Sequence, residues 1–151
     1  MRLLLSTFSH DKIKKNYIDL GKRGRLNKNN KLNSLTGKEW IKFTKSWFLH
    51  RPARRNNKEI LHPAKFPESL VKEFIEFFTK EDEWVLDPFL GSGSTLLAAG
   101  DINRNAVGVE LTKKFFKITN DRIKERNYKF NILSLQGDSK KLNGILEENN
   151  L

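Results

Sequence analysis

The 151-residue chain contains no cysteine, which excludes disulfide bonds and any chemistry or metal site that depends on a thiolate. No apolar run approaches the roughly 18 residues that a membrane-spanning helix needs. The opening MRLLLSTFSHDK is too short in its apolar part for a secretory signal and has no small-residue cleavage site. These absences, with a charged fraction of 31%, favour a soluble protein that we expect in the cytoplasm.

Acidic residues are scarce in the first part of the chain. Residues 1–60 contain 16 Lys or Arg and only 4 Asp or Glu, a net charge of +12, whereas residues 61–151 carry −1. An excess of this kind favours a polyanionic partner, because cationic side chains displace condensed counterions from phosphates. The alternative is a solvated basic arm without a partner. Residues 10–33 have little periodicity and read as a linker or as a loop that only a partner orders, so we expect a basic, flexible arm over 1–34 and a separate, incomplete domain over 35–151.

Aromatic residues alternate with lysines in residues 36–50, TGKEWIKFTKSWFLH. Such a pattern suits stacking on nucleic-acid bases, and it equally suits an amphipathic segment that packs on the core. We favour packing on the core for the apolar residues of this segment, which are Trp40, Ile41, Phe43, Trp47 and Phe48.

From residue 61 onward the chain alternates helical and strand-like patterns. Pro67 suits a first helical position, and a helical face that we expect to be buried follows it, comprising Leu70, Val71, Phe74, Ile75, Phe77 and Phe78. Strands are predicted at 84–87, where the strand should be buried, at 106–110 and at 130–138. Helices are predicted at 94–99, from an N-cap at Thr112, and from Lys140. This succession predicts an α/β fold with a parallel sheet of about three strands and flanking helices.

The stretch VLDPFLGSGSTLLAAG, residues 85–100, combines a strand, a glycine turn and a helix, which is a common way to hold a nucleotide. A phosphate-binding P-loop needs a lysine after its last glycine, but Gly93 is followed by Ser94. A dinucleotide fingerprint needs a third glycine where this chain has Leu96. The carboxylate of Asp87, directly before the turn, would repel a pyrophosphate and would suit a ligand that carries positive charge.

S-adenosylmethionine is a ligand of that kind, with an ammonium group, a cationic sulfonium and a carboxylate that backbone N–H groups at a helix start can bind. Glu110 ends the second predicted strand, where an acid commonly accepts hydrogen bonds from ribose hydroxyls. Asp138 ends the third strand and is placed to accept from the adenine amine. Each of these two acids alone could instead cap the helix that follows it.

Four ordered motifs resemble those of the amino-group DNA methyltransferases, which methylate adenine N6 or cytosine N4. They are HPAKFP (62–67), DPFLGSGST (87–95), GVEL (108–111) and QGDS (136–139), and LTGKEWIKFTKSWF resembles a segment upstream of them. The resemblance covers about residues 35–142. It implies a Rossmann-like methyltransferase fold and a role in DNA modification, often beside a restriction enzyme. It also implies that S-adenosyl-L-methionine contacts His62, Pro63, Ala64, Lys65, Phe66, Asp87, Pro88, Phe89, Gly91, Ser92, Gly93, Ser94, Thr95, Glu110 and Asp138.

The catalytic motif of that family, an Asp, Asn or Ser followed by two prolines and an aromatic residue, has no counterpart here. The chain has four prolines, and no two of them are adjacent. We therefore expect the cofactor-binding part of a truncated or split methyltransferase, inactive alone, with double-stranded DNA and a complementing polypeptide as partners and with no metal. Two alternatives stay open: a non-catalytic nucleic-acid-binding module, and a methyltransferase that acts on RNA or protein.

Overall fold

The computed structural model describes residues 17–19, 21–23, 25–27, 30–45, 47–50 and 66–151, and it divides the chain into two compact units, Met1–Asn30 and Lys31–Leu151. In the first unit, β1 (Tyr17–Asp19) pairs antiparallel with β2 (Arg25–Asn27) across the short helix η1 (Gly21–Arg23). The sequence predicted no regular structure here, and that prediction was wrong for these residues. Strands of three residues are too short to carry a readable alternation of apolar and polar positions.

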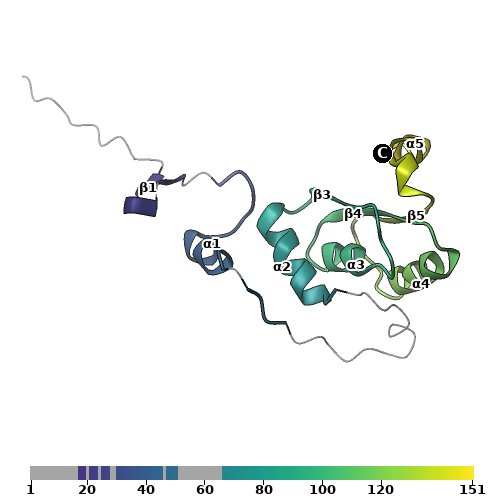
Figure 1. The fold of residues 1–151 in the computed structure, drawn as a ribbon, viewed down its shortest axis with the longest axis horizontal. Coiled ribbons are helices and arrows are strands. Elements are labelled where there is room, and N and C mark those ends of the chain that lie inside the picture. Colours follow the sequence, from purple (N-terminus) through teal and green to yellow (C-terminus); the bar gives the residue numbers. More distant parts are fainter. Residues whose placement is uncertain (1–16, 20, 24, 28–29, 46, 51–65) are drawn as a thin grey trace, which may run out of the picture. The chain divides into compact units, whose positions relative to one another are not determined.

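The second unit contains a parallel sheet of three strands in the order β3-β4-β5, as predicted. The strands are β3 (Trp84–Asp87), β4 (Asn105–Glu110) and β5 (Ile132–Gln136), and Leu86 lies opposite Val107, which lies opposite Leu133. In Figure 1 the helices α2 (Glu68–Phe78), α3 (Ser94–Gly100) and α4 (Lys113–Lys124) lie in a row along the sheet. The short helix η2 (Ser139–Lys141) and α5 (Leu142–Glu148) end the chain.

Strand β3 is more exposed than predicted. Its side chains alternate, so that Val85 packs against the core while Trp84 and Leu86 remain 47% and 46% exposed. The apolar run WVLD carries no polar residue on its outer face, and for that reason the sequence predicted a buried strand. The expectation of a buried strand is therefore wrong for Trp84 and Leu86.

Helix α3 forms the centre of the core. Leu96, Leu97, Ala98 and Ala99 are all 0% exposed, because the sheet lies on one side of the helix and α2 on another. Gly100 is the last residue of α3, and a Cβ atom there would lie 2.8 Å from the ring of Tyr128. The small residues of LLAAG thus permit the close approach of sheet, helix and ring.

Aromatic side chains join α1 (Gly37–Phe43) to α2. Phe43 stacks on Phe77 with ring centroids 4.0 Å apart, Trp40 lies 4.6 Å from Phe77, and Phe48 lies 5.1 Å from Phe74. Packing on the core is therefore confirmed for Trp40 and Phe43, which contact the buried Phe77, whereas Phe48 contacts the partly exposed Phe74. The other two residues of the aromatic segment, Ile41 and Trp47, are exposed.

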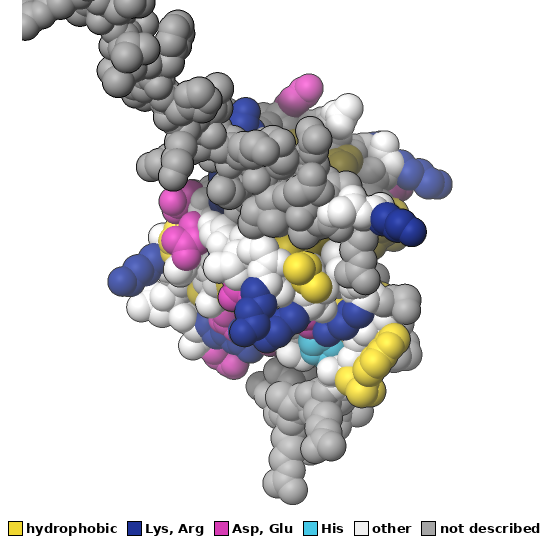
Figure 2. Space-filling model, turned by 90° about the vertical axis from the view of Figure 1, so that its left-hand side faces the viewer, with side chains coloured by type: hydrophobic (Ala, Val, Ile, Leu, Met, Phe, Trp, Pro, Cys, Tyr) yellow, Lys and Arg dark blue, Asp and Glu magenta, His cyan; other side chains and the backbone are white. Residues whose placement is uncertain are grey.

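Two details of α2 differ from the sequence prediction. Pro67 is the N-cap, one residue before the helix begins, and of the predicted buried face only Ile75 and Phe77 are buried. Phe78 is 55% exposed and Phe74 is 37% exposed. Figure 2, turned by 90° from the view of Figure 1, shows separate apolar patches between Lys and Arg side chains.

The start of the second unit is fixed by Asn33, which is 2% exposed. Its side-chain amide donates to the carbonyl oxygen of Phe77, and its Oδ1 accepts from Trp40 Nε1 at 3.1 Å. Residues from 31 onward therefore pack with the sheet unit, a few residues earlier than the predicted boundary after residue 34. Within the described ranges no helix has the length and apolar character needed to cross a bilayer.

Candidate functional site

The carboxyl ends of the three parallel strands meet at one edge of the sheet, beside the glycine turn that joins β3 to α3. A cavity of about 390 Å³ opens there, a size typical of small-molecule sites. Its lining combines two carboxylates, one lysine, several backbone segments and exposed apolar side chains; the residues are Pro88, Phe89, Gly91, Val109, Glu110, Leu111, Gly137, Asp138, Ser139 and Lys140.

Glu110 is the buried acid of this cavity, with 9% of the residue exposed. Its Oε2 accepts from the backbone N–H of Gly91 at 2.8 Å, and its Oε1 accepts from the N–H of Thr112 at 2.8 Å. The carboxylate therefore holds the glycine turn and the start of α4 together. An ionised carboxylate has about four acceptor positions, so both oxygens retain capacity for donors of a ligand in the cavity.

Asp138 is the second acid of the cavity. Its Oδ1 accepts from the N–H of Lys140 at 3.0 Å and so caps η2. The capping role left open from the sequence is therefore present. It leaves Oδ2 without a partner among the described residues, so that capping and ligand binding are compatible in this carboxylate.

Asp87 does not join the other two acids. It ends β3, but its Oδ1 accepts from the N–H of Phe89 at 3.0 Å, and the residue is absent from the cavity lining. The carboxylate thus shapes the start of the glycine turn. The sequence correctly predicted that Glu110 and Asp138 lie at one edge of the sheet, because the ends of strands can be located from the sequence. The direction in which a side chain points at a strand end cannot be predicted in this way.

The glycine turn needs its glycines. Gly91 and Gly93 have φ angles of 57° and 84°, in the left-handed region that other residues rarely adopt. A Cβ atom on Gly93 would also lie 2.6 Å from Thr119 Cγ2. Behind the turn, Thr119 Oγ1 donates to the carbonyl of Gly91 at 3.0 Å, and Arg122 donates to the carbonyl of Ser92.

The other predicted site residues are divided between the cavity and its surroundings. Pro88, Phe89 and Gly91 line the cavity, and the side chain of Phe89 is exposed. The buried residues of the turn are Ser92, Gly93 and Ser94, while Thr95 is half-buried outside the lining. Phe66 is exposed, and His62 to Lys65 lie outside the described residues.

Several lining residues were missed from the sequence. Leu111, which is 68% exposed, directly follows Glu110, and Ser139 and Lys140 directly follow Asp138. The sequence did offer a signal for them, because each follows an acid at a strand end by one or two residues. Thr112 does occupy the predicted N-cap position of α4, but its side chain makes no capping hydrogen bond.

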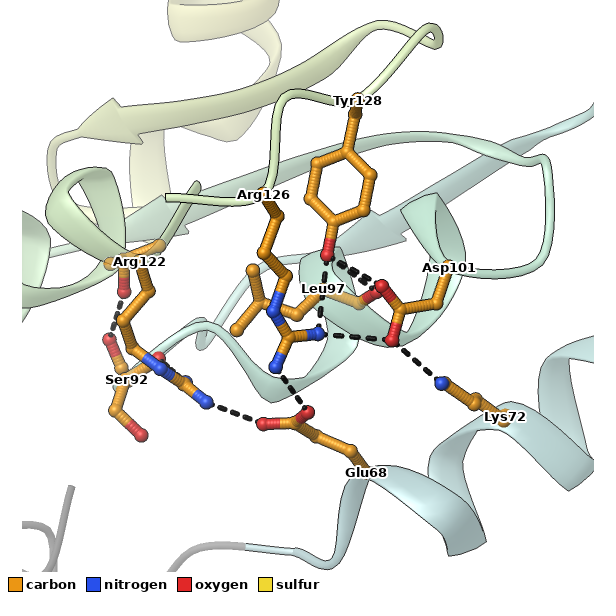
Figure 3. A network of polar contacts seen from close by, with 10 residues as sticks. Glu68, Lys72, Ser92, Leu97, Asp101, Arg122, Arg126 and Tyr128 are labelled. Atoms are coloured by element: carbon orange, nitrogen blue, oxygen red, sulfur yellow. Dashed lines mark hydrogen bonds and ion pairs between the residues drawn. The ribbon is translucent and has the colours of Figure 1, made fainter. Parts of the chain in front are cut away.

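A network of charged side chains joins α2 to α4 behind the turn (Figure 3). Glu68, at the start of α2, accepts from Arg122 through Oε1 and from Arg126 through Oε2, the latter at 3.0 Å. Asp101 pairs with Arg126 at 2.9 Å and with Lys72 at 2.6 Å, and it accepts from the Tyr128 hydroxyl at 2.9 Å. Burial and the neighbouring Asp101 raise the pKa of Tyr128 well above its ordinary value.

The network predicts a dependence of stability on pH. Burial acts to raise the pKa of Glu68, but the charges of Arg122 and Arg126 outweigh it and hold that pKa below its ordinary 4.5. A carboxyl with a lowered pKa stabilises the fold fully above its unfolded value, and this contribution is lost as pH falls through the folded value. As the pH is lowered from 4.5, the free energy of unfolding should therefore decrease, and it should decrease less steeply in Glu68→Gln. Urea unfolding between about pH 7 and pH 3 checks this, with the exposed Glu148→Gln as control.

The family model for DNA methylases, the N6/N4 group, matches residues 5–121 of this chain. The chain belongs to the N6/N4 DNA methylase family. The Type II methyltransferase M.BglI of Bacillus subtilis is 30% identical to this methylase chain over 131 residues, and M.HindIII of Haemophilus influenzae is 45% identical over 62 residues. A DNA modification methylase from Thermus thermophilus, solved in complex with S-adenosyl-L-methionine, matches with a TM-score of 0.52 and 28% identity.

The chain spans well under half of the length of these relatives. The match to M.BglI covers 78% of this chain but 36% of that protein, and the match to M.HindIII covers 41% and 20%. The match to the Thermus structure covers 68% of this chain and 39% of that chain. The α/β fold with a parallel sheet agrees with the fold that the sequence predicted.

Proposed function

We propose that this chain is the S-adenosyl-L-methionine-binding part of a site-specific DNA methyltransferase that modifies adenine N6 or cytosine N4. The observation that carries the proposal is the cavity at the strand ends, which Glu110, Asp138 and Phe89 line together beside the glycine turn. Family membership and the ligand of the Thermus relative support the same cofactor.

The residues of the cavity fit the adenosine part of that cofactor. Its ribose hydroxyls and adenine amine are donors, and the carboxylates of Glu110 and Asp138 are acceptors with remaining capacity. The exposed side chains of Phe89 and Leu111 provide apolar contact surface for a purine ring. A dinucleotide or triphosphate fits less well, because two carboxylates and a single lysine line the cavity.

The cofactor would supply an activated methyl group on its sulfonium: an amine nitrogen would take this methyl group by direct displacement, the thioether would leave, and the amine would lose a proton to water. In this scheme Glu110 and Asp138 orient the donor, and none of the described residues is assigned to the acceptor base. The sequence has no [DNS]-P-P-[YFW] motif, so a complementing polypeptide would hold the flipped base. The truncated or split state of the enzyme and its cytoplasmic location are part of this proposal.

Calorimetry with S-adenosyl-L-methionine tests the cofactor. The wild-type chain is expected to bind, and Asp138→Ala is expected to weaken binding at least tenfold, because the free Oδ2 acceptor is lost. Asp121→Ala, an exposed acid on α4 outside the cavity, serves as the matched control and should bind as the wild type does. Incubation with labelled cofactor and duplex DNA should give no methyl transfer until a polypeptide with the catalytic motif is added.

The outcomes separate the two candidate functions. A chain that binds duplex DNA but not the cofactor would support the alternative, a nucleic-acid-binding module derived from a methyltransferase. Methyl transfer by the chain alone would contradict the proposal that catalysis requires a second polypeptide. Transfer to RNA or protein instead of DNA would contradict the proposed substrate class.

The basic region predicts how DNA binding depends on salt. The net charge of +12 in residues 1–60 offers many phosphate contacts, so DNA affinity should fall steeply as salt rises. Deleting residues 1–30 keeps the buried Asn33 in the chain. This deletion should make DNA affinity depend less steeply on salt and leave cofactor binding unchanged. Gel-shift titrations at several salt concentrations measure it, with Lys124→Gln plus Lys129→Gln as the control. Equal loss of DNA and cofactor binding would instead assign the region a structural role.

A further inference from the structure

The glycine turn is held from behind by two polar side chains of α4 that no sequence motif includes. Thr119 is 0% exposed and donates to the carbonyl oxygen of Gly91, and Arg122 is 7% exposed and donates to the carbonyl oxygen of Ser92. These contacts join residues 28 and 30 positions apart in the sequence. Gly91 lines the cavity, whereas neither Thr119 nor Arg122, both of them described, does. The two side chains therefore contact the turn on its far side.

Each of these contacts fixes the orientation of a whole peptide unit. In a trans peptide the C=O and the N–H point in opposite directions, so a carbonyl held by α4 directs the next N–H away from α4. Thr119 thereby directs the N–H of Ser92 away from the helix. Arg122 does the same for the N–H of Gly93, which donates to the carbonyl of Leu90 at 3.1 Å.

Gly91 is consequently fixed from two sides. Its N–H donates to Glu110 at 2.8 Å, and its C=O accepts from Thr119 at 3.0 Å. Glycine has the widest backbone freedom of all residues, so a turn of this composition would sample many conformations without such contacts. Arg122 is itself anchored, because its second nitrogen donates to Glu68 at the start of α2 (Figure 3).

We propose that Thr119 and Arg122 are positioning residues for the cofactor site: they hold the glycine turn in the shape that binds S-adenosyl-L-methionine. This inference rests on the proposed function. The two residues act through the backbone of the turn and contribute no atom to the cavity. Preorganisation of this kind raises affinity, because the turn is already ordered in the folded chain and need not be ordered when the ligand binds.

The decisive comparison is Thr119→Val against Thr119→Ser. Valine has nearly the shape of threonine but lacks the hydroxyl, whereas serine keeps it. By calorimetry, Thr119→Val should raise the dissociation constant for S-adenosyl-L-methionine by roughly tenfold, and Thr119→Ser should stay within about twofold of the wild type. In the amide spectrum of the ligand-free chain, the Ser92 signal should move in Thr119→Val and much less in Thr119→Ser.

Arg122→Met against Arg126→Met separates positioning from general stability. Both arginines pair with Glu68, but only Arg122 contacts the turn. Both variants should unfold at a lower temperature, and only Arg122→Met should weaken cofactor binding when measured well below that temperature. Equal affinities in the wild type, Thr119→Val and Arg122→Met would overturn the inference alone. Absence of binding by every chain, the wild type included, would instead contradict the proposed function on which it rests.

Discussion

Gly93→Ala is expected to lower the free energy of unfolding by about 3 kcal/mol and to remove measurable binding of S-adenosyl-L-methionine. Two costs combine at this position. The φ angle of 84° lies in the left-handed region, which is strained for alanine, and the added Cβ atom would lie 2.6 Å from Thr119 Cγ2. Thr119 is fully buried and cannot turn away without losing its hydrogen bond to Gly91.

Urea unfolding followed by circular dichroism measures this change, and Gly144→Ala provides a matched control. Gly144 lies within α5, its φ is not in the left-handed region, and no atom lies within 4 Å of a Cβ built there. Alanine should therefore stabilise that helix by about 0.5–1 kcal/mol. If Gly93→Ala left the free energy of unfolding unchanged or raised it, as Gly144→Ala should, the strain attributed to the turn would be contradicted.

Glu110→Ala is the second substitution with a large expected effect. It removes the acceptor of two backbone N–H groups, those of Gly91 and Thr112, at a position where only 9% of the residue is exposed. Hydrogen bonds to charged groups contribute about 1.5–3 kcal/mol each. The free energy of unfolding should fall by about 3 kcal/mol, because water that enters the space left by the side chain replaces part of the two bonds. Cofactor binding should fall further than in Asp138→Ala, because the turn also loses its anchor to β4.

Glu110→Gln refines the test. Its side-chain oxygen accepts one N–H, but its amide group faces the other N–H, so stability and affinity should lie between those of the wild type and Glu110→Ala. Glu148→Ala, an exposed acid at the end of α5, should leave both quantities unchanged. Stability equal to the wild type in Glu110→Ala would show that the two N–H groups find other partners.

The sheet and the edge that carries the site were predictable from the sequence. The apolar run 106–110 ends in Glu110, and a glycine turn separates Asp87 from a helix of small residues, so strand ends could be located without coordinates. The parallel order followed from the helices between the strands. Chain connectivity thus determined which acids would lie at the same edge.

The orientation of individual side chains was not predictable. Asp87 accepts from the N–H of Phe89 in its own turn, and it is not among the residues that line the cavity. Thr119 and Arg122 were overlooked because a polar residue on a helix gives no sign of a partner some 30 positions away. Trp84 and Leu86 were assigned to the interior because apolarity alone does not distinguish a covered face from an open one.

Every residue of α3 except Thr95 is buried, and this burial couples the glycine turn to the rest of the fold. This helix begins directly after the glycine turn, and Leu96 and Leu97 have no exposed surface, so the turn cannot rearrange far without opening the core. A ligand that binds only the folded turn then stabilises the entire sheet unit rather than one loop. At a concentration one hundred times the dissociation constant, this linkage adds about 2.7 kcal/mol to the free energy of unfolding. A bound ligand should therefore raise the unfolding temperature of strands and helices that do not contact it.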